Sequence, residues 1–224
     1  MPDIGRFTKL LFADQSLTDL LAGVAGYDEE GVSRELWMRL KEAERCLRED
    51  RKGEGAAVLT ELVSAKSIET RVLLWSWRAL RQIGVQPNIE LASKIQGVVL
   101  QVPMPGGADV LAAYDDGTAR YLNFTGKVLS WNIPDHSIHG IIRALLVQAQ
   151  KLDSTAKSRL DAHSAGTPIK VSILTVGGNH EVEIPCDSVG NGSIEQLLSI
   201  GAELITRLKN RSEVVSRLIE PPSH

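Results

Sequence analysis

Two histidines, His136 and His139, lie three residues apart in the first turn of a predicted helix. This spacing puts both imidazoles on one side of the helix, where they could share a metal ion. A zinc site needs a further protein ligand, and none is tied to the pair by local spacing. The candidates are Asp135, His163, His180 and Cys186. One interpretation is therefore a metal-binding protein or metal-dependent enzyme that uses His136 and His139. The other is that both histidines are surface residues of the helix without a metal.

Thiol chemistry is a weaker possibility, because Cys186 lies next to Asp187 and six residues after His180. A nucleophile, a base and an orienting carboxylate could come from these residues, but no signature motif surrounds the cysteine. No serine has a G-x-S-x-G context and no phosphate-binding G-x-x-x-x-G-K-[ST] loop occurs. The sequence therefore predicts no catalytic residue and no cofactor, and an enzyme is less favoured than a binding protein.

The amino-acid composition limits the classes of protein to which the chain can belong. The chain has 224 residues, 43% of them hydrophobic, and a net charge of -3. No apolar run approaches the roughly 18 residues of a membrane span, and the first residues do not form a secretory signal. Two cysteines 140 positions apart do not form a disulfide framework. We expect a cytoplasmic protein that binds neither membrane nor nucleic acid.

Residues 1–96 are predicted to be helical throughout. Apolar residues that begin at Val32 recur at spacings of four, four, three and four, which is typical of one face of an amphipathic helix. They are Val32, Leu36, Leu40, Ala43 and Leu47. Cap and turn residues delimit about five helices, near residues 16–23, 28–51, 56–63, 67–84 and 88–95.

The fourth of these helices is apolar on nearly every side. A helix of this kind is buried, so it is expected to be the central helix of this half, with Trp37 packed near it. The alternative is that one of its tryptophans contacts a partner. Trp75 and Trp77 lie about 200° apart around the axis and cannot share a face. Trp75, Trp77 and Trp37 are therefore the candidate interaction residues.

At Gly97 the hydrophobic period changes from helical to two, which is typical of strands. Tight turns at Asp115–Gly117 and Thr125–Gly126 predict an antiparallel four-strand meander. A helix after Pro134, a second hairpin around Gly177 and a final helix capped by Ser193 follow. Residues 97–224 are thus predicted to form an α+β sandwich of order ββββ-α-ββ-α, with both helices packed on an antiparallel sheet.

The sequence supports one leading function and two alternatives. The leading hypothesis is a non-enzymatic interaction or adaptor protein that acts through a protein partner or as a homo-oligomer. Two features support it. One is the helix that carries Trp75 and Trp77, and the other is that a six-stranded sheet has exposed edge strands, which must be covered in some way. Besides the metal site, the alternative is a small-ligand sensor with a pocket between sheet and helix, lined by Tyr114, Tyr121 and Trp131.

Overall fold

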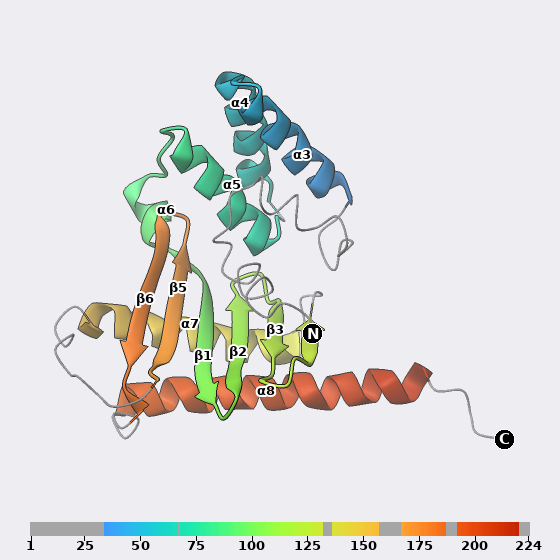
Figure 1. Ribbon diagram of the computed structural model, residues 1–224, viewed down its shortest axis with the longest axis vertical. Helices are drawn as coiled ribbons and strands as arrows, with labels where there is room; N and C mark the ends of the chain where they lie inside the picture. Colours follow the sequence, from blue (N-terminus) through green and yellow to red (C-terminus); the bar gives the residue numbers. More distant parts are fainter. Residues whose placement is uncertain (1–33, 67, 132–135, 157–166, 187–191, 220–224) are drawn as a thin grey trace. The chain divides into compact units, whose positions relative to one another are not determined.

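The computed structural model describes residues 34–66, 68–131, 136–156, 167–186 and 192–219, and only the backbone of residues 34, 136, 153–156 and 211–219. The chain divides into two compact units. The helical unit comprises residues 2–97 with 173–180, and the sheet unit comprises residues 98–172 with 181–224. The predicted α+β class is confirmed: helices precede a six-stranded sheet, and two further helices accompany it (Figure 1).

The described part of the helical unit contains α3 (Arg34–Arg48), α4 (Lys52–Ser64), α5 (Thr70–Gln82) and α6 (Ile89–Ser93). The predicted stripe of α3 is buried at Leu40 and Ala43, because this face of the helix packs against α4. Asn88, where the last helix of this half was predicted to start, is the N-cap of α6, and its Oδ1 accepts a hydrogen bond of 2.8 Å from the amide of Leu91. The helix predicted at 16–23 and the cap predicted at Ser67 lie outside the described residues.

The predicted central helix α5 supplies the core of the helical unit. Trp75 is 2% exposed, and its ring centroid lies 6.1 Å from that of Trp37. The guanidinium of Arg71 lies 5.7 Å from the centre of the Trp75 ring and pairs with Glu69. Aromatic packing between Trp37 and Trp75 therefore joins α3 to α5, while the cation–π contact within α5 orients the Trp75 ring.

The sheet has the order β4-β3-β2-β1-β5-β6, so β4 and β6 are its edges. Its strands are β1 (Ile95–Met104), β2 (Gly107–Tyr114), β3 (Ala119–Leu122), β4 (Val128–Trp131), β5 (Ile169–Thr175) and β6 (Gly178–Ile184). The predicted meander is confirmed, since β2 pairs with β3 and β3 with β4, both antiparallel.

Two three-residue loops close the hairpins of the meander. The amide of Tyr114 donates to the carbonyl of Thr118, and that of Asn123 to the carbonyl of Lys127, both at 3.0 Å. The last loop residues, Gly117 and Gly126, have φ values of 84° and 90°. Glycine adopts this left-handed conformation without steric cost, which explains why each predicted turn ends in glycine.

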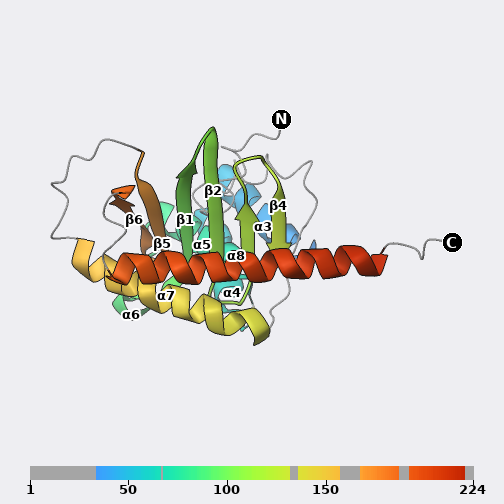
Figure 2. The ribbon, with the colours of Figure 1, turned by 90° about the horizontal axis from the view of Figure 1, so that it is seen from below.

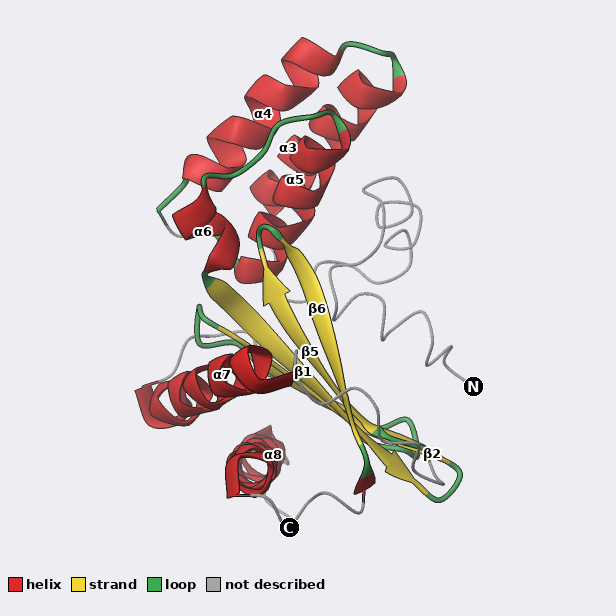
Figure 3. Ribbon diagram, turned by 90° about the vertical axis from the view of Figure 1, so that its left-hand side faces the viewer, coloured by secondary structure: helices red, strands yellow, loops and turns green. Residues whose placement is uncertain are grey.

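Helices α7 (His136–Ala156) and α8 (Gly192–Ile219) lie side by side on one face of the sheet (Figures 2 and 3). A Cβ added to Gly201 of α8 would lie 2.8 Å from Cδ1 of Leu100 in β1 and 3.5 Å from Cδ2 of Leu111 in β2. The missing side chain therefore lets α8 approach the centre of the sheet closely. α8 begins at Gly192, so Ser193 lies inside its first turn rather than at the predicted cap, an error within the usual uncertainty of helix ends.

Candidate interaction surface

The edge strand β4 has main-chain N–H and C=O groups that do not form hydrogen bonds with β3. Asn123 and Lys127 form a hydrogen-bonded pair, and such pairs alternate with non-bonded pairs along an antiparallel ladder. The register pairs Leu122 with Val128 and Arg120 with Ser130, which are therefore the non-bonded pairs. The N–H and C=O groups of Val128 and Ser130 consequently point away from β3, toward the open side of the edge.

The two edges of the sheet differ in charge. The side chains of β4 are Val128, Leu129, Ser130 and Trp131, all uncharged. At the other edge, Glu181 and Glu183 of β6 both pair with Lys170 of β5, at 3.1 and 3.0 Å. Charged side chains discourage pairing with another chain. The four residues of β4 carry no charge, and the short length of the strand is the feature that limits such pairing.

Exposed apolar side chains gather where β4 begins. Met104, Phe124 and Val128 are 36%, 38% and 39% exposed. They come from the end of β1, the β3–β4 turn and the start of β4, which all lie at one end of the meander. A Cβ at Gly107 would lie 3.2 Å from the carbonyl oxygen of Phe124, so the β1–β2 and β3–β4 turns are in contact. We call Met104, Phe124 and Val128 the apolar corner.

The turn that carries Phe124 is held by side-chain hydrogen bonds. Oδ1 of Asn123 accepts from the amide of Thr125 at 3.1 Å, its hydroxyl at 2.8 Å and the amide of Lys127 at 2.8 Å. Oδ1 of Asp109 accepts from the amide of Phe124 at 2.9 Å. Phe124 is thus displayed on a preorganised loop, which lowers the entropy cost of binding. Sequence reasoning missed it, although an aromatic residue in a tight polar turn was the available signal.

The other carboxylate oxygen of Asp109 anchors β3. Oδ2 accepts a hydrogen bond of 2.8 Å from the hydroxyl of Tyr121, which is buried on the α8 side of the sheet. The ammonium of Lys209 in α8 lies 5.2 Å from the centre of the Tyr121 ring. Burial, helped by the bond to Asp109 and its negative charge, raises the pKa of Tyr121 to about 12.

This pKa predicts a loss of stability at alkaline pH. Above pH 10 an unfolded tyrosine ionises, while folded Tyr121 keeps its proton up to about pH 12. The unfolded state then binds fewer protons, so the free energy of unfolding falls as pH rises between these values. Denaturant unfolding at several pH values tests this: Tyr121→Phe should show a shallower alkaline fall than the wild type. Equal slopes for the two proteins would contradict the prediction.

The structure brings together only part of the predicted ligand pocket. Tyr121 pairs with both Leu111 and Leu129, so Trp131, two residues beyond Leu129, lies on the same face as Tyr121. Tyr114 is three residues from Leu111 and therefore lies on the opposite face. It is fully buried there, with the guanidinium of Arg120 at 5.7 Å from its ring centre. Tyr114 thus cannot line one pocket with Tyr121 and Trp131.

The predicted metal and thiol residues are only partly described. His139 is half-buried on α7, and the side chain of His136 lies outside the described part, as do Asp135, His163 and Asp187. His180 and Cys186 are exposed, and Sγ of Cys186 lies 3.4 Å from the carbonyl oxygen of Thr167. Within the described residues, no three His, Cys, Asp or Glu side chains gather to hold a metal ion. The metal site stays a prediction.

The candidate tryptophans lie in the helical unit. Trp37 and Trp75 are buried against one another, and Trp77 is half-buried. This arrangement favours the core role expected of α5. The candidate interaction surface therefore comprises the β4 edge and the apolar corner instead.

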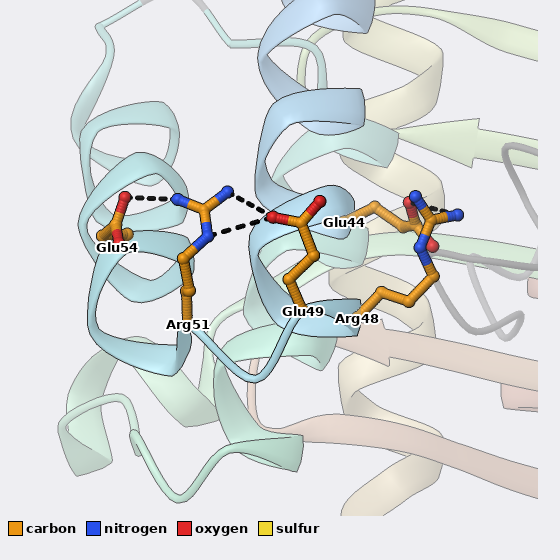
Figure 4. A network of polar contacts seen from close by, with 5 residues as sticks. All are labelled: Glu44, Arg48, Glu49, Arg51 and Glu54. Atoms are coloured by element: carbon orange, nitrogen blue, oxygen red, sulfur yellow. Dashed lines mark hydrogen bonds and ion pairs between the residues drawn. The ribbon is translucent and has the colours of Figure 1, made fainter.

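A network of ion pairs closes the α3–α4 junction (Figure 4). Arg51 donates from Nε and Nη2 to Oε2 of Glu49, at 3.1 and 2.7 Å, and from Nη1 to Glu54. Nearby, Arg48 and Glu44 pair at 3.9 Å. The hydrogen bond from Arg51 lowers the pKa of Glu49, which Arg45 and Arg48 lower further by their charge. The network joins the start of α4 to the end of α3.

Because these charges are exposed, their effect should depend on salt. We expect Arg51→Gln to lower the melting temperature slightly at low ionic strength, and to match the wild type in about 1 M salt, where the Debye length is about 3 Å. The stabilisation should also disappear as acid protonates Glu49, since the lowered pKa favours the folded state only while the carboxylate is charged. Lys52→Gln, which removes a single exposed pair with Asp50, is the control. A deficit that persists in high salt would contradict the prediction.

Comparison with known proteins finds no relative: no family model, curated protein or solved structure matches the chain. None of the helices in the described ranges combines the length and apolar character that a bilayer crossing requires.

Proposed function

We propose that this chain is a non-enzymatic interaction protein of the cytoplasm, which recognises another protein chain at the β4 edge and the apolar corner. The observation that carries the proposal is the difference between the two sheet edges. One edge carries paired charges on Lys170, Glu181 and Glu183. The other offers the outward main-chain groups of Val128 and Ser130 without a charge on the strand.

The β4 edge and the apolar corner together have the features required for the addition of a strand from another chain. An added strand can bond to the main chain of β4, while its side chains contact the faces of the sheet. Phe124 provides a rigid aromatic group next to this edge, and aromatic residues are frequent anchors in protein interfaces. We propose neither a cofactor nor a nucleic-acid partner, in keeping with the net charge of -3.

The test compares proteins retained by tagged wild type and by Val128→Lys, expressed in the cells of origin and cross-linked before purification. A lysine at this exposed position opposes pairing at the edge. His180→Lys, on exposed β6, is the matched control. We expect at least one protein, a second copy of the chain included, to be retained by wild type and control and lost from Val128→Lys. Identical sets for all three would overturn the proposal.

A further inference from the structure

We propose that the occupant of the β4 edge is the β4 strand of a second copy of this chain, related by a two-fold axis that passes midway between the Leu129 residues of the two copies. This inference rests on the proposed function and names its partner. The two strands would run antiparallel and join the two sheets into one.

The spacing of the outward groups suits this symmetry. Val128 and Ser130 point outward on either side of Leu129. A two-fold axis midway between the two Leu129 residues places Val128 opposite Ser130 of the second copy, and Ser130 opposite its Val128. Each of these pairs can exchange two main-chain hydrogen bonds, giving four in all. Leu129 then faces its own symmetry mate in a non-bonded pair, where side chains are closest.

The charges near the edge are compatible with this register. The only charged side chain next to β4 in the described turn is that of Lys127. In this register Lys127 lies opposite Trp131 of the second copy, where an ammonium and an indole attract one another. Like charges do not meet across the paired strands. At the β6 edge, by contrast, two glutamates alternate along the strand.

Helix α8 extends beyond the edge toward the second copy. Gly201 packs over β1 and β2, and Lys209 lies over Tyr121 of β3, so the helix runs across the strands toward β4. Ten further residues reach Ile219, a length of about 15 Å. Strands are about 4.8 Å apart, so the end of α8 passes β4 by about 10 Å. Figure 2 shows α8 continuing beyond β4.

The part of α8 that extends beyond β4 would add buried surface area to an interface that the short strand alone makes too small. A specific interface buries at least about 1,000 Å² in total, and four paired residues are too few for that. β4 is an edge, so no strand of the described sheet lies beneath the end of α8. The sequence there contains apolar residues and charges of both signs: Val214, Val215 and Leu218 with Arg211, Glu213 and Arg217. A second copy brings its own α8 and sheet to this end of the helix.

Sedimentation velocity of the untagged full chain over a wide concentration range tests the proposal. We expect a dimer that Ser130→Pro dissociates, with a dissociation constant raised at least about tenfold, because proline removes two of the four hydrogen bonds. The lost N–H points away from β3, so the β3–β4 ladder stays intact. Ser130→Ala keeps the N–H and should remain dimeric. Circular dichroism verifies the fold of each variant.

A cross-link tests the register and does not depend on the proline variant folding. In a Cys186→Ser background, Leu129→Cys should form a disulfide between copies under mild oxidation, since its two copies face each other across the axis. Val128→Cys faces Ser130 and should cross-link far less. The remaining cysteine, Cys46, is buried.

The outcomes separate this inference from the proposed function. A monomer at every concentration, or a dimer that Ser130→Pro and Val128→Lys leave unchanged, overturns the second copy as the occupant. If the chain is monomeric but Val128→Lys still loses a different protein from the cross-linked set, the edge recognises that protein and only this inference fails. If the edge variants change neither measurement, both proposals fail.

Discussion

Replacement of Trp75 by alanine is expected to lower the free energy of unfolding by about 3–5 kcal/mol. Trp75 is 2% exposed and packs against Trp37, with Arg71 over its ring. The substitution removes a buried indole ring near the centre of α5 and leaves a cavity beside Trp37 of α3. Because domains are stable by only about 5–15 kcal/mol, the helical unit should be close to unfolding. Urea denaturation followed by far-ultraviolet circular dichroism measures the change.

The matched control is Trp75→Phe. The indole nitrogen of Trp75 is buried and forms no hydrogen bond with any residue in the described part of the chain. Phenylalanine therefore loses ring volume but no polar contact, and we expect it to cost much less than alanine. If Trp75→Ala unfolds at nearly the wild-type denaturant concentration, Trp75 is not a core residue, and its role as an interaction residue becomes the better hypothesis.

Local patterns in the sequence predicted most of the elements. The apolar spacing that starts at Val32 gave a face of α3 that is buried at Leu40 and Ala43. The glycines at 117 and 126 indicated hairpin turns, and both adopt positive φ. These features depend on residues close together in the chain, where periodicity and turn chemistry decide the conformation.

The candidate interaction surface could not be predicted from local patterns, because it depends on which strands become neighbours in the sheet. Strand order places β5 next to β1, which leaves β4 at an edge. That choice follows from how the hairpin after α7 packs on the sheet, and no short motif encodes it. The edge position of Val128 is a consequence of this order, so sequence reasoning named Tyr114, Tyr121 and Trp131 instead. Alternation along β2 and β3 then placed Tyr114 on the other face.

Replacement of Asp109 by alanine is expected to lower the free energy of unfolding by about 2–4 kcal/mol. One carboxylate oxygen accepts from the hydroxyl of Tyr121 and the other from the amide of Phe124. Alanine leaves the buried hydroxyl of Tyr121 without its acceptor and releases the turn that displays Phe124. In the double variant Asp109→Ala with Tyr121→Phe, part of the loss should be recovered, because the unsatisfied hydroxyl is gone.

Asp109→Asn is the control that separates the two contacts. Its amide oxygen can still accept from the amide of Phe124, and its nitrogen can donate to the oxygen of Tyr121. We therefore expect a smaller loss of stability and an unchanged turn. Because Asp109 holds the turn that carries Phe124, Asp109→Ala should also weaken binding at the proposed β4 interface, whereas Tyr121→Phe, which leaves the bond to Phe124 intact, should not. Equal binding at the β4 edge by wild type and Asp109→Ala would contradict a role for this hydrogen bond in presenting Phe124.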